Sequence, residues 1–340
     1  MKSKNLIIGL LLLVGILTAY YFFTFSNKKT SEPLTENPVT AKVTMAVVIS
    51  GGSRLQADLI KSLEIDKKYN IDIDLKPYGV AEIPALVASG AVDVGSIAPL
   101  QAAKLLEEGQ KVKILLPIFK PDGCYILVHP GSGIEKVKEL LGKRIGMSAK
   151  NTATYTFSDV VFSLNGYSLE KDFKITNTAF PGLIPLFEKK DVDAVIGLCD
   201  ETVTSDLISS ERAVGVDNLQ DMWIKGIGEN VATFIGMLTS KSDWAETNSE
   251  KVQALRLVYK DLFEYIHSHP EIYDDPKIRE SLQIKSDAQA EVAKDLSKKF
   301  HPKPEDVDQQ KLTKFLDIFF EKAVETKVLE SIPQENLLAD

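Results

Sequence analysis

Hydrophobic and polar positions follow a regular alternation along most of this chain, but an unbroken apolar run comes first. Residues 6–25 contain no charged side chain, and a helix of that length at about 1.5 Å per residue crosses a bilayer core of roughly 30 Å. Lys2 and Lys4 precede the run, as they would in an export signal. Because no small-x-small motif follows it, we expect an uncleaved anchor with its N-terminus inside. A cleaved signal is the alternative.

The segment after the anchor changes character abruptly. Residues 26–41 are mostly polar, include two prolines and show no apolar periodicity. Such a composition is typical of a flexible tether.

From residue 43 onward, short apolar stretches alternate with amphipathic ones. The first round predicts four strands and three helices: strands at 43–49, 71–75, 92–95 and 112–118, and helices at 54–68, 82–89 and 96–109. A second round repeats the pattern: strands at 124–128, 144–147 and 192–198, and helices at 134–141, 154–165 and 184–190. A further strand is predicted at 231–238, and the pattern is mainly helical after residue 249. Alternation of this kind predicts an α/β fold with two doubly wound lobes.

Composition narrows the classes of protein and site. The chain has 340 residues and a net charge of −8, and the part beyond the tether is long enough for two lobes. The acid excess argues against nucleic acid as a partner. The histidines form no cluster with carboxylates at metal-ligand spacing, so we expect no metal site and no cofactor. Cys124 and Cys199 form either one disulfide or two small buried side chains.

Four segments carry a resemblance to a known family. They are residues 43–52, a strand and a glycine turn; 84–99 (PALVASGAVDVGSIAP); 134–148 (IEKVKELLGKRIGMS); and 187–197 (FEKKDVDAVIG). Their order and spacing over residues 42–268 resemble the type II periplasmic solute-binding proteins of ABC importers. The similar branch binds nitrate, sulfonates, taurine and thiamine-pyrimidine precursors.

The resemblance implies two lobes joined by a hinge. Residues 42–121 and 224–340 would form lobe 1, and residues 122–223 would form lobe 2. The crossovers between them would lie near residues 121–124 and 222–225. Such a protein is not an enzyme: it binds a small solute, works with an ABC permease and ATPase on the extracytoplasmic face of the membrane, and acts as a monomer.

Ligands of open α/β sheets bind beyond the carboxyl ends of the strands, where loops enter helices. Backbone N–H groups at those helix N-termini receive anions, and Ser and Thr hydroxyls add hydrogen bonds. The candidate ligand-binding residues are Ser50, Gly51, Gly52, Ser53, Ser96 and Ile97 in lobe 1, and Tyr125, Ser148, Asn151, Thr152, Ala153 and Asp200 in lobe 2. Ser96 and Thr152 have the alternative role of simple helix caps.

Charged residues near these loops bear on the kind of solute. Asp200 and Glu201 follow a strand where relatives often place an aromatic residue; they either receive an amine or ring N–H of the ligand or point to solvent. Arg54 and Lys150 are the candidate cations. A strongly anionic ligand usually recruits Arg. Because only one Arg lies near these loops, we expect a neutral, aromatic or zwitterionic solute rather than a sulfonate.

Two other functions remain open at this point. A ligand-sensing ectodomain tethered by the anchor would have the same organisation. An enzyme on the same fold is the other, although neither a Gly-x-Ser-x-Gly motif nor the cysteine-rich, iron-binding stretch of enzymatic relatives occurs here.

Overall fold

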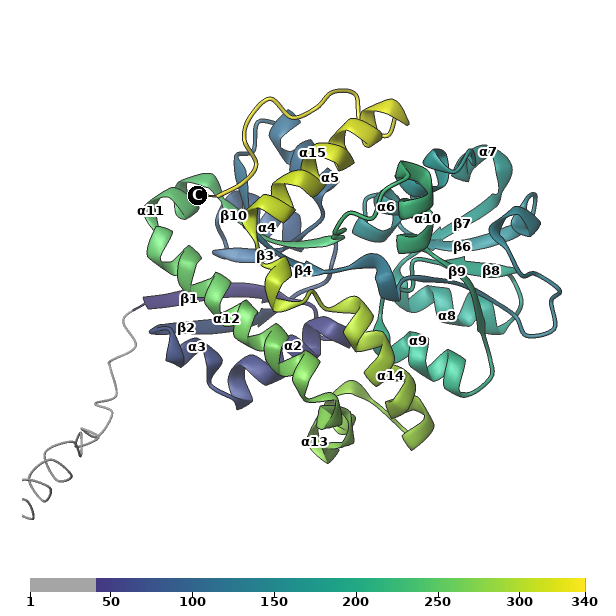
Figure 1. Cartoon of the computed structure of the whole chain (residues 1–340), viewed down its shortest axis with the longest axis horizontal. Coiled ribbons are helices and arrows are strands. Elements are labelled where there is room, and N and C mark those ends of the chain that lie inside the picture. The colour runs from purple at the N-terminus through teal and green to yellow at the C-terminus, as the bar shows by residue number, and fades with distance from the viewer. Residues whose placement is uncertain (1–40, 340) are drawn as a thin grey trace, which may run out of the picture. The chain divides into compact units, whose positions relative to one another are not determined.

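Two mixed sheets, each covered by helices, make up the part of the chain that this computed structural model describes, residues 41–339 (Figure 1). The predicted anchor, and the predicted tether apart from its last residue, lie outside these residues. Within the described range, no helix is both long and apolar enough to span a membrane.

The first sheet combines strands that are far apart in the sequence. Its order is β2 (Ile71–Pro77), β1 (Ala41–Val47), β3 (Val94–Ile97), β10 (Gly236–Lys241) and β4 (Val112–Phe119). The first three are parallel, and β10 lies antiparallel between β3 and β4. A single bridge between Ile114 and Leu338 adds the end of the described chain beside β4.

The second sheet has the same arrangement but comes from one continuous stretch. Its order is β7 (Lys174–Thr178), β6 (Arg144–Ser148), β8 (Ala194–Ile196), β5 (Tyr125–Val128) and β9 (Val214–Asn218). Again three strands are parallel, and the fourth, β5, runs antiparallel to both of its neighbours. Side chains alternate along β5: Ile126 and Val128 join the main core, whereas Leu127 joins a smaller core with Leu183 and Phe187 of α8.

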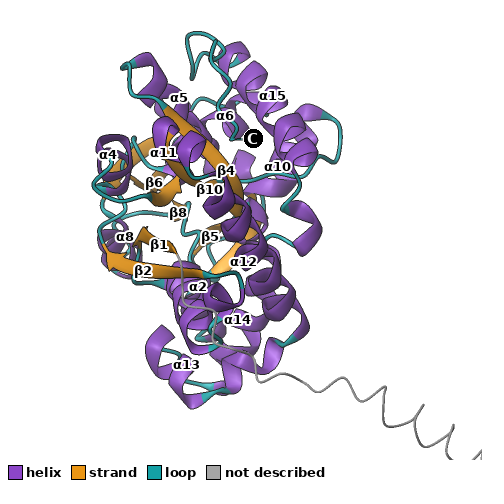
Figure 2. Cartoon of the chain, turned by 90° about the vertical axis from the view of Figure 1, so that its left-hand side faces the viewer, coloured by secondary structure: helices purple, strands orange, loops and turns teal. Residues whose placement is uncertain are grey.

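Helices cover both faces of each sheet (Figure 2). Those before β10 are α2 (Gly51–Ser62), α3 (Ile65–Lys68), α4 (Ile83–Ser89), α5 (Pro99–Glu107), η1 (Pro121–Gly123), η2 (Val137–Leu140), α6 (Ala153–Leu164), α7 (Leu169–Asp172), α8 (Phe180–Glu188), α9 (Glu201–Ser209) and α10 (Leu219–Ile227). Those after β10 are α11 (Ser242–Thr247), α12 (Ser249–Ser268), η3 (Pro270–Asp274), α13 (Pro276–Leu282), α14 (Asp287–Phe300), η4 (Pro304–Asp306) and α15 (Gln309–Glu325).

Close packing of α4 on β3 explains why glycine occupies position 95, within the segment 84–99 that carries the family resemblance. A Cβ added at Gly95 would lie 2.6 Å from Cγ2 of Ile83. The small residue therefore lets the helix approach the sheet.

Several predicted boundaries were wrong for local reasons. The predicted helix at 54–68 divides at Glu64, whose φ of +51° is left-handed. The predicted helix at 134–141 is only the short turn η2, which Glu139 caps by accepting from the backbone N–H groups of Glu135 and Lys136. Strand β10 starts at Gly236 rather than residue 231, and Phe234, just before it, packs its ring against Phe315 of α15.

The helices after β10 contact both halves of the molecule. Helix α12 packs against α2 and β4, α15 contacts α6, and α14 packs along α9. Residues 222–225, predicted as the second crossover, instead lie within α10, and the chain returns to the first sheet through residues 228–235. The exact domain boundaries remain a prediction.

Candidate functional site

The predicted site residues fall mostly on the loops that leave the carboxyl ends of four parallel strands. Ser50–Ser53 begin α2 after β1, and Ser96 and Ile97 end β3. Ser148 ends β6, residues 151–153 lead into α6, and Asp200 precedes α9 after β8. The topology thus places two loops of the first sheet and two of the second at facing edges.

These facing loops touch at two points. A Cβ added at Gly51 would lie 2.6 Å from Cγ of Asp200, so the Asp200 carboxylate lies against the Gly51 backbone in space that a larger residue would fill, and the φ of Gly51 is +49°. At the second point, Gln101 Nε2 of α5 donates to the carbonyl oxygen of Asn151 at 2.5 Å. Oε1 of the same amide accepts from Ala98 N and caps α5. Gln101 was not predicted, although a Gln at the third position of a helix is a capping signal.

Asp200 forms the best-defined part of this site. Its Oδ1 accepts from the backbone N–H groups of Thr202 and Val203, at 3.0 and 3.1 Å, and from the Thr202 hydroxyl at 2.7 Å. Burial is the main reason that the pKa of the Asp200 carboxyl is raised, the neighbouring charge of Glu201 adds to the rise, and these hydrogen bonds oppose it. The side chain therefore points neither to solvent nor into an open cleft.

A hydroxyl cluster lines the loop between β6 and α6. Ser148 Oγ lies 2.7 Å from Thr152 Oγ1 and 2.8 Å from Thr154 Oγ1. Thr152 also accepts from the backbone N–H of Tyr155, so it does serve as the cap of α6. The cluster presents hydroxyl donors and acceptors next to a helix N-terminus.

Ser53 and Ser96 line a small cavity inside the first lobe, together with Gln56 and Tyr259. Its volume is about 20 Å³, which is room for one water. The remaining walls are mostly apolar side chains of β1 and α2.

Other predicted residues lie away from these loops or are already engaged. The Tyr125 hydroxyl accepts from Lys299 Nζ of α14 at 3.0 Å, and Ile97 is buried in the core. Arg54 pairs with Asp58 at 3.0 Å.

Lys150, the second candidate cation, forms an exposed ion pair with Glu170. Gly52 packs under Phe119, Phe300 and His301, so it permits close packing rather than exposing backbone to a ligand.

Cys124 and Cys199 form a disulfide, with 4.5 Å between their Cα atoms. The bond joins the residue after η1 to the residue before Asp200. It therefore fixes the loop that carries Asp200 to the connection between the two sheets.

Sequence reasoning missed a buried polar network behind this loop. Tyr273 donates to Glu201 Oε1 at 2.8 Å, and His301 Nε2 lies 3.2 Å from Glu201 Oε2. Gln56 Nε2 lies 3.1 Å from His301 Nδ1 and donates to the carbonyl oxygen of Ile118 at 3.1 Å. Since an amide nitrogen only donates, Nδ1 accepts, and the proton of the neutral imidazole is on Nε2, which lies near Glu201 Oε2 without a hydrogen bond to it.

The network joins elements that are far apart in the sequence. It connects α9, η3, the end of α14 and α2, and the side chains of His301 and Glu201 are fully buried. Burial, followed by the charge of Glu201, raises the pKa of Tyr273 well above its usual value. His267, at the end of α12, is half-buried and hydrogen-bonds the carbonyl oxygens of His301 and Pro302.

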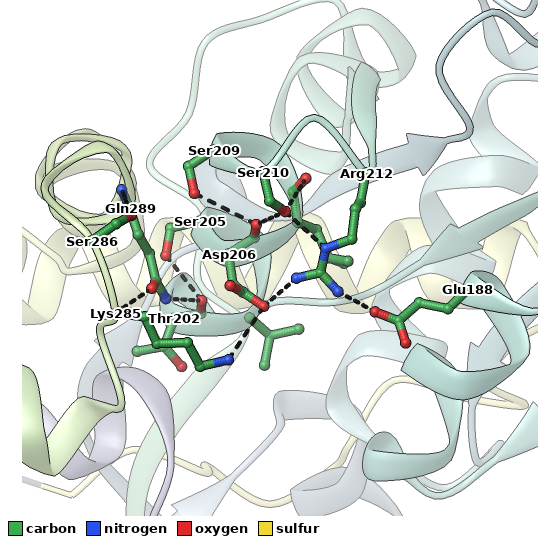
Figure 3. A network of polar contacts seen from close by, with 12 residues as sticks. Glu188, Thr202, Ser205, Asp206, Ser209, Ser210, Arg212, Lys285, Ser286 and Gln289 are labelled. Atoms are coloured by element: carbon green, nitrogen blue, oxygen red, sulfur yellow. Dashed lines mark hydrogen bonds and ion pairs between the residues drawn. The ribbon is translucent and has the colours of Figure 1, made fainter.

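A second set of polar contacts ties α9 to α14 on the exposed side (Figure 3). Gln289 Nε2 donates to the carbonyl oxygen of Thr202 at 3.2 Å, and Lys285 Nζ lies 4.0 Å from Asp206 Oδ2. Arg212 also pairs with Asp206. Helix α9, which carries the site loop, is thus held on two sides. Within residues 41–339, no group of three or more His, Cys, Asp or Glu side chains is arranged to hold a metal ion.

Comparison with known proteins identifies the family. The family model described as NMT1/THI5 like matches residues 67–272. The chain belongs to this family. Among curated protein sequences, none matches the chain significantly.

Solved structures show the same fold. The alkanesulfonate-binding protein SsuA from Xanthomonas axonopodis pv. citri, bound to MOPS, has a TM-score of 0.66 at 14% identity, covering 88% of this chain and 96% of that one. The periplasmic aliphatic sulphonate binding protein SsuA from Escherichia coli has a TM-score of 0.64 at 15% identity, with 86% and 89% covered. A Candida albicans protein with the generic periplasmic binding protein fold has a TM-score of 0.54 at 16% identity, with 85% and 90% covered. This NMT1/THI5-like chain therefore has the periplasmic-binding-protein fold, as its sequence motifs predicted.

Proposed function

We propose that this chain is the extracytoplasmic solute-binding component of an ABC import system. It binds a small organic or anionic solute, of the sulfonate, nitrate, taurine or pyrimidine-like kind, between its lobes and delivers it to a permease and ATPase. The apolar run at residues 6–25 exports the chain and holds it at the membrane. The binding component acts as a monomer.

The observation that carries this proposal is the meeting of loops from both sheets. Gly51 faces Asp200, and Gln101 donates to Asn151, across the line between the two sheets. A solute bound there would touch both lobes, and its binding energy would stabilise the closed arrangement over an open one. The disulfide and the buried network keep one wall of the site rigid.

The burial of His301 and Glu201 argues against a catalytic role for this pair. Its composition is that of two members of a hydrolase triad, but both side chains are shut off from solvent. A general base must reach the proton that it removes. We therefore assign the pair a structural role.

Thermal unfolding of the full chain against a panel of solutes tests the proposal. The panel holds nitrate, taurine, alkyl- and arylsulfonates, phthalate, thiamine-pyrimidine precursors and riboflavin. A ligand at about 100 times its dissociation constant adds roughly 2.7 kcal/mol of stability, which a melting curve resolves.

The Gln101→Ala variant serves as the companion measurement, because it removes a contact between the lobes without touching the core of either sheet. It should weaken binding of any solute that shifts the wild-type protein. A folded protein that no solute of the panel stabilises would contradict the proposal.

A further inference from the structure

The imidazole ring of His301 lies between helices of the two lobes. Gln56 of α2, in lobe 1, has its amide nitrogen 3.1 Å from Nδ1, and Glu201 of α9, in lobe 2, has Oε2 3.2 Å from Nε2. All three residues are buried. His301 itself follows the last residue of α14, the helix that packs along α9. A change in the protonation of this one ring therefore acts on both lobes.

The contact with α2 requires a neutral ring. The amide nitrogen of Gln56 donates to the carbonyl oxygen of Ile118 and to Nδ1 of His301, each at 3.1 Å, and these two bonds use both of its hydrogens. A protonated imidazole carries a hydrogen on each nitrogen, so two donors would then face each other. Gln56 could accept only by turning its amide over, and Ile118 would lose this donor.

The contact with α9 favours a charged ring. His301 Nε2 and Glu201 Oε2 are buried atoms without a hydrogen-bond partner, although they are close to each other. The other oxygen of Glu201 already accepts from the Tyr273 hydroxyl at 2.8 Å. A positive charge on the ring would convert this unbonded approach into an ion pair in a medium of low dielectric. Protonation thus weakens the contact with lobe 1 and strengthens the contact with lobe 2.

The other groups around the ring come from several elements. Uncharged rings surround it from β4, α12 and α14, with centroids 5.9, 6.3 and 6.1 Å away: Phe119, Phe263 and Phe300. The titratable and charged groups on that side of the molecule are Glu201, Asp200 just before it, Tyr273 of η3, His267 of α12, which hydrogen-bonds the carbonyl oxygen of His301, and Lys303, whose charge acts on His267. An ionised Glu201 is in direct contact with the ring and stabilises its charged form.

We propose that His301 is a pH-dependent contact between the lobes. The neutral ring holds the end of α14 to α2, and the protonated ring releases α2 and pairs with the carboxylate of α9. Histidine is the side chain that ordinarily changes charge between about pH 5 and 8. Because α2 begins with Gly51–Ser53 of the candidate site, acidification loosens that wall of the site. The device goes beyond the proposed solute binding and does not depend on which solute is bound.

Two measurements on the full chain without solute test the proposal. Nitrogen-15 NMR of the histidine rings should show His301 protonated on Nε2 alone at about pH 8 and on both nitrogens at about pH 5. Hydrogen exchange followed by mass spectrometry then compares the helices. After correction for the intrinsic rates, amides of α2 should exchange about fivefold faster at the lower pH, the effect expected for losing one hydrogen bond. Amides of α9 should not become less protected.

Three variants isolate the ring. His301→Asn places an amide oxygen where Nδ1 accepts from Gln56 and cannot be protonated, so α2 should exchange equally at both pH values. Gln56→Glu supplies an acceptor for the protonated Nδ1 and should also abolish the acid response. His267→Gln is the matched control, because it removes a neighbouring titratable ring and keeps an N–H donor for the carbonyl oxygens of His301 and Pro302; it should respond as the wild type does.

The proposal is overturned if His301 stays neutral at about pH 5. It is also overturned if the ring becomes protonated and the exchange of α2 does not change, or if His301→Asn responds to acid as the wild type does. Should His301→Asn fail to fold, Gln56→Glu decides: an unchanged acid response in that variant contradicts the proposal, and its loss supports it.

Discussion

His301 Nε2 lies 3.2 Å from Oε2 of Glu201, and both side chains are completely buried. Glu201 begins α9, whereas His301 follows α14, one hundred positions later in the chain. Through Gln56 the same network reaches α2. One buried contact therefore links the wall of the candidate site to both lobes.

Removing one member of this pair should be strongly destabilising. Glu201→Ala leaves the buried Tyr273 hydroxyl without its acceptor, so we expect a loss of about 1–3 kcal/mol in the free energy of unfolding. Urea denaturation measures it. Glu170→Gln, which breaks only the exposed pair with Lys150, should cost less than about 1 kcal/mol. Equal losses in the two variants would contradict a structural role for the buried pair.

The disulfide should contribute to stability by closing a long loop. Cys124 and Cys199 are 75 residues apart, and the loop-entropy relation gives about 4.5 kcal/mol for a loop of that size. We expect the Cys124→Ser, Cys199→Ser double variant to unfold at lower urea. A reductant should shift the wild type toward the double variant and leave the double variant unchanged. If reductant does not change the urea unfolding of the wild type, the disulfide is absent or contributes no stability.

Gly51→Ala should separate the lobes. The new methyl group would enter the space of the Asp200 carboxylate, and Gly51 is also left-handed, so the lobes should be pushed apart at this contact. Small-angle X-ray scattering should report a larger radius of gyration. Gly109→Ala is the matched control, because Gly109 is also left-handed, with a φ of +78°, but a Cβ there meets nothing within 4 Å. The same expansion in both variants would contradict a specific contact.

The raised pKa of Asp200 predicts the sign of a pH dependence. Between the ordinary Asp pKa of about 3.9 and the raised value, the folded state holds a proton that the unfolded chain has lost. Stability from this group is thus greatest at low pH and is lost as the pH rises through the folded pKa. The unfolding free energy of the wild type, minus that of Asp200→Asn, should fall with rising pH.

Denaturation curves between about pH 2 and 8 measure that difference, and a carboxyl with the opposite shift provides the control. The hydrogen bond from Arg144 is the main reason that the pKa of Asp193 is lowered. The corresponding difference for Asp193→Asn should rise with pH over the lower part of the titration. If the wild type and Asp200→Asn differ in unfolding free energy by the same amount at every pH, burial does not raise the pKa of Asp200.

Local periodicity was enough to predict the alternation of strands and helices and the loops at the strand ends. Those features depend on neighbouring residues, as in the buried strand β6 or the capped start of α6. Thr152 was weighed as both a cap and a ligand contact, and it does cap α6.

Features that depend on residues far apart in the sequence were not predictable. No local pattern marks β10 as the strand between β3 and β4, and nothing near Glu201 indicates that His301 will be its partner. The pairing of Cys124 with Cys199 stayed open for the same reason, since it requires the two Cα atoms to be brought within bonding range.

The position of β10 has a consequence for how the polypeptide acquires its structure as it is synthesised. The strands of the second sheet come from a single stretch that ends at Asn218. The first sheet, in contrast, cannot be completed until residues 236–241 have been synthesised. Until those residues arrive, β3 and β4 each have an open edge, which is a place where other chains can pair. The early-synthesised half of the first lobe is therefore the part that most needs a chaperone or rapid release, and the middle of the chain is the part that folds without waiting.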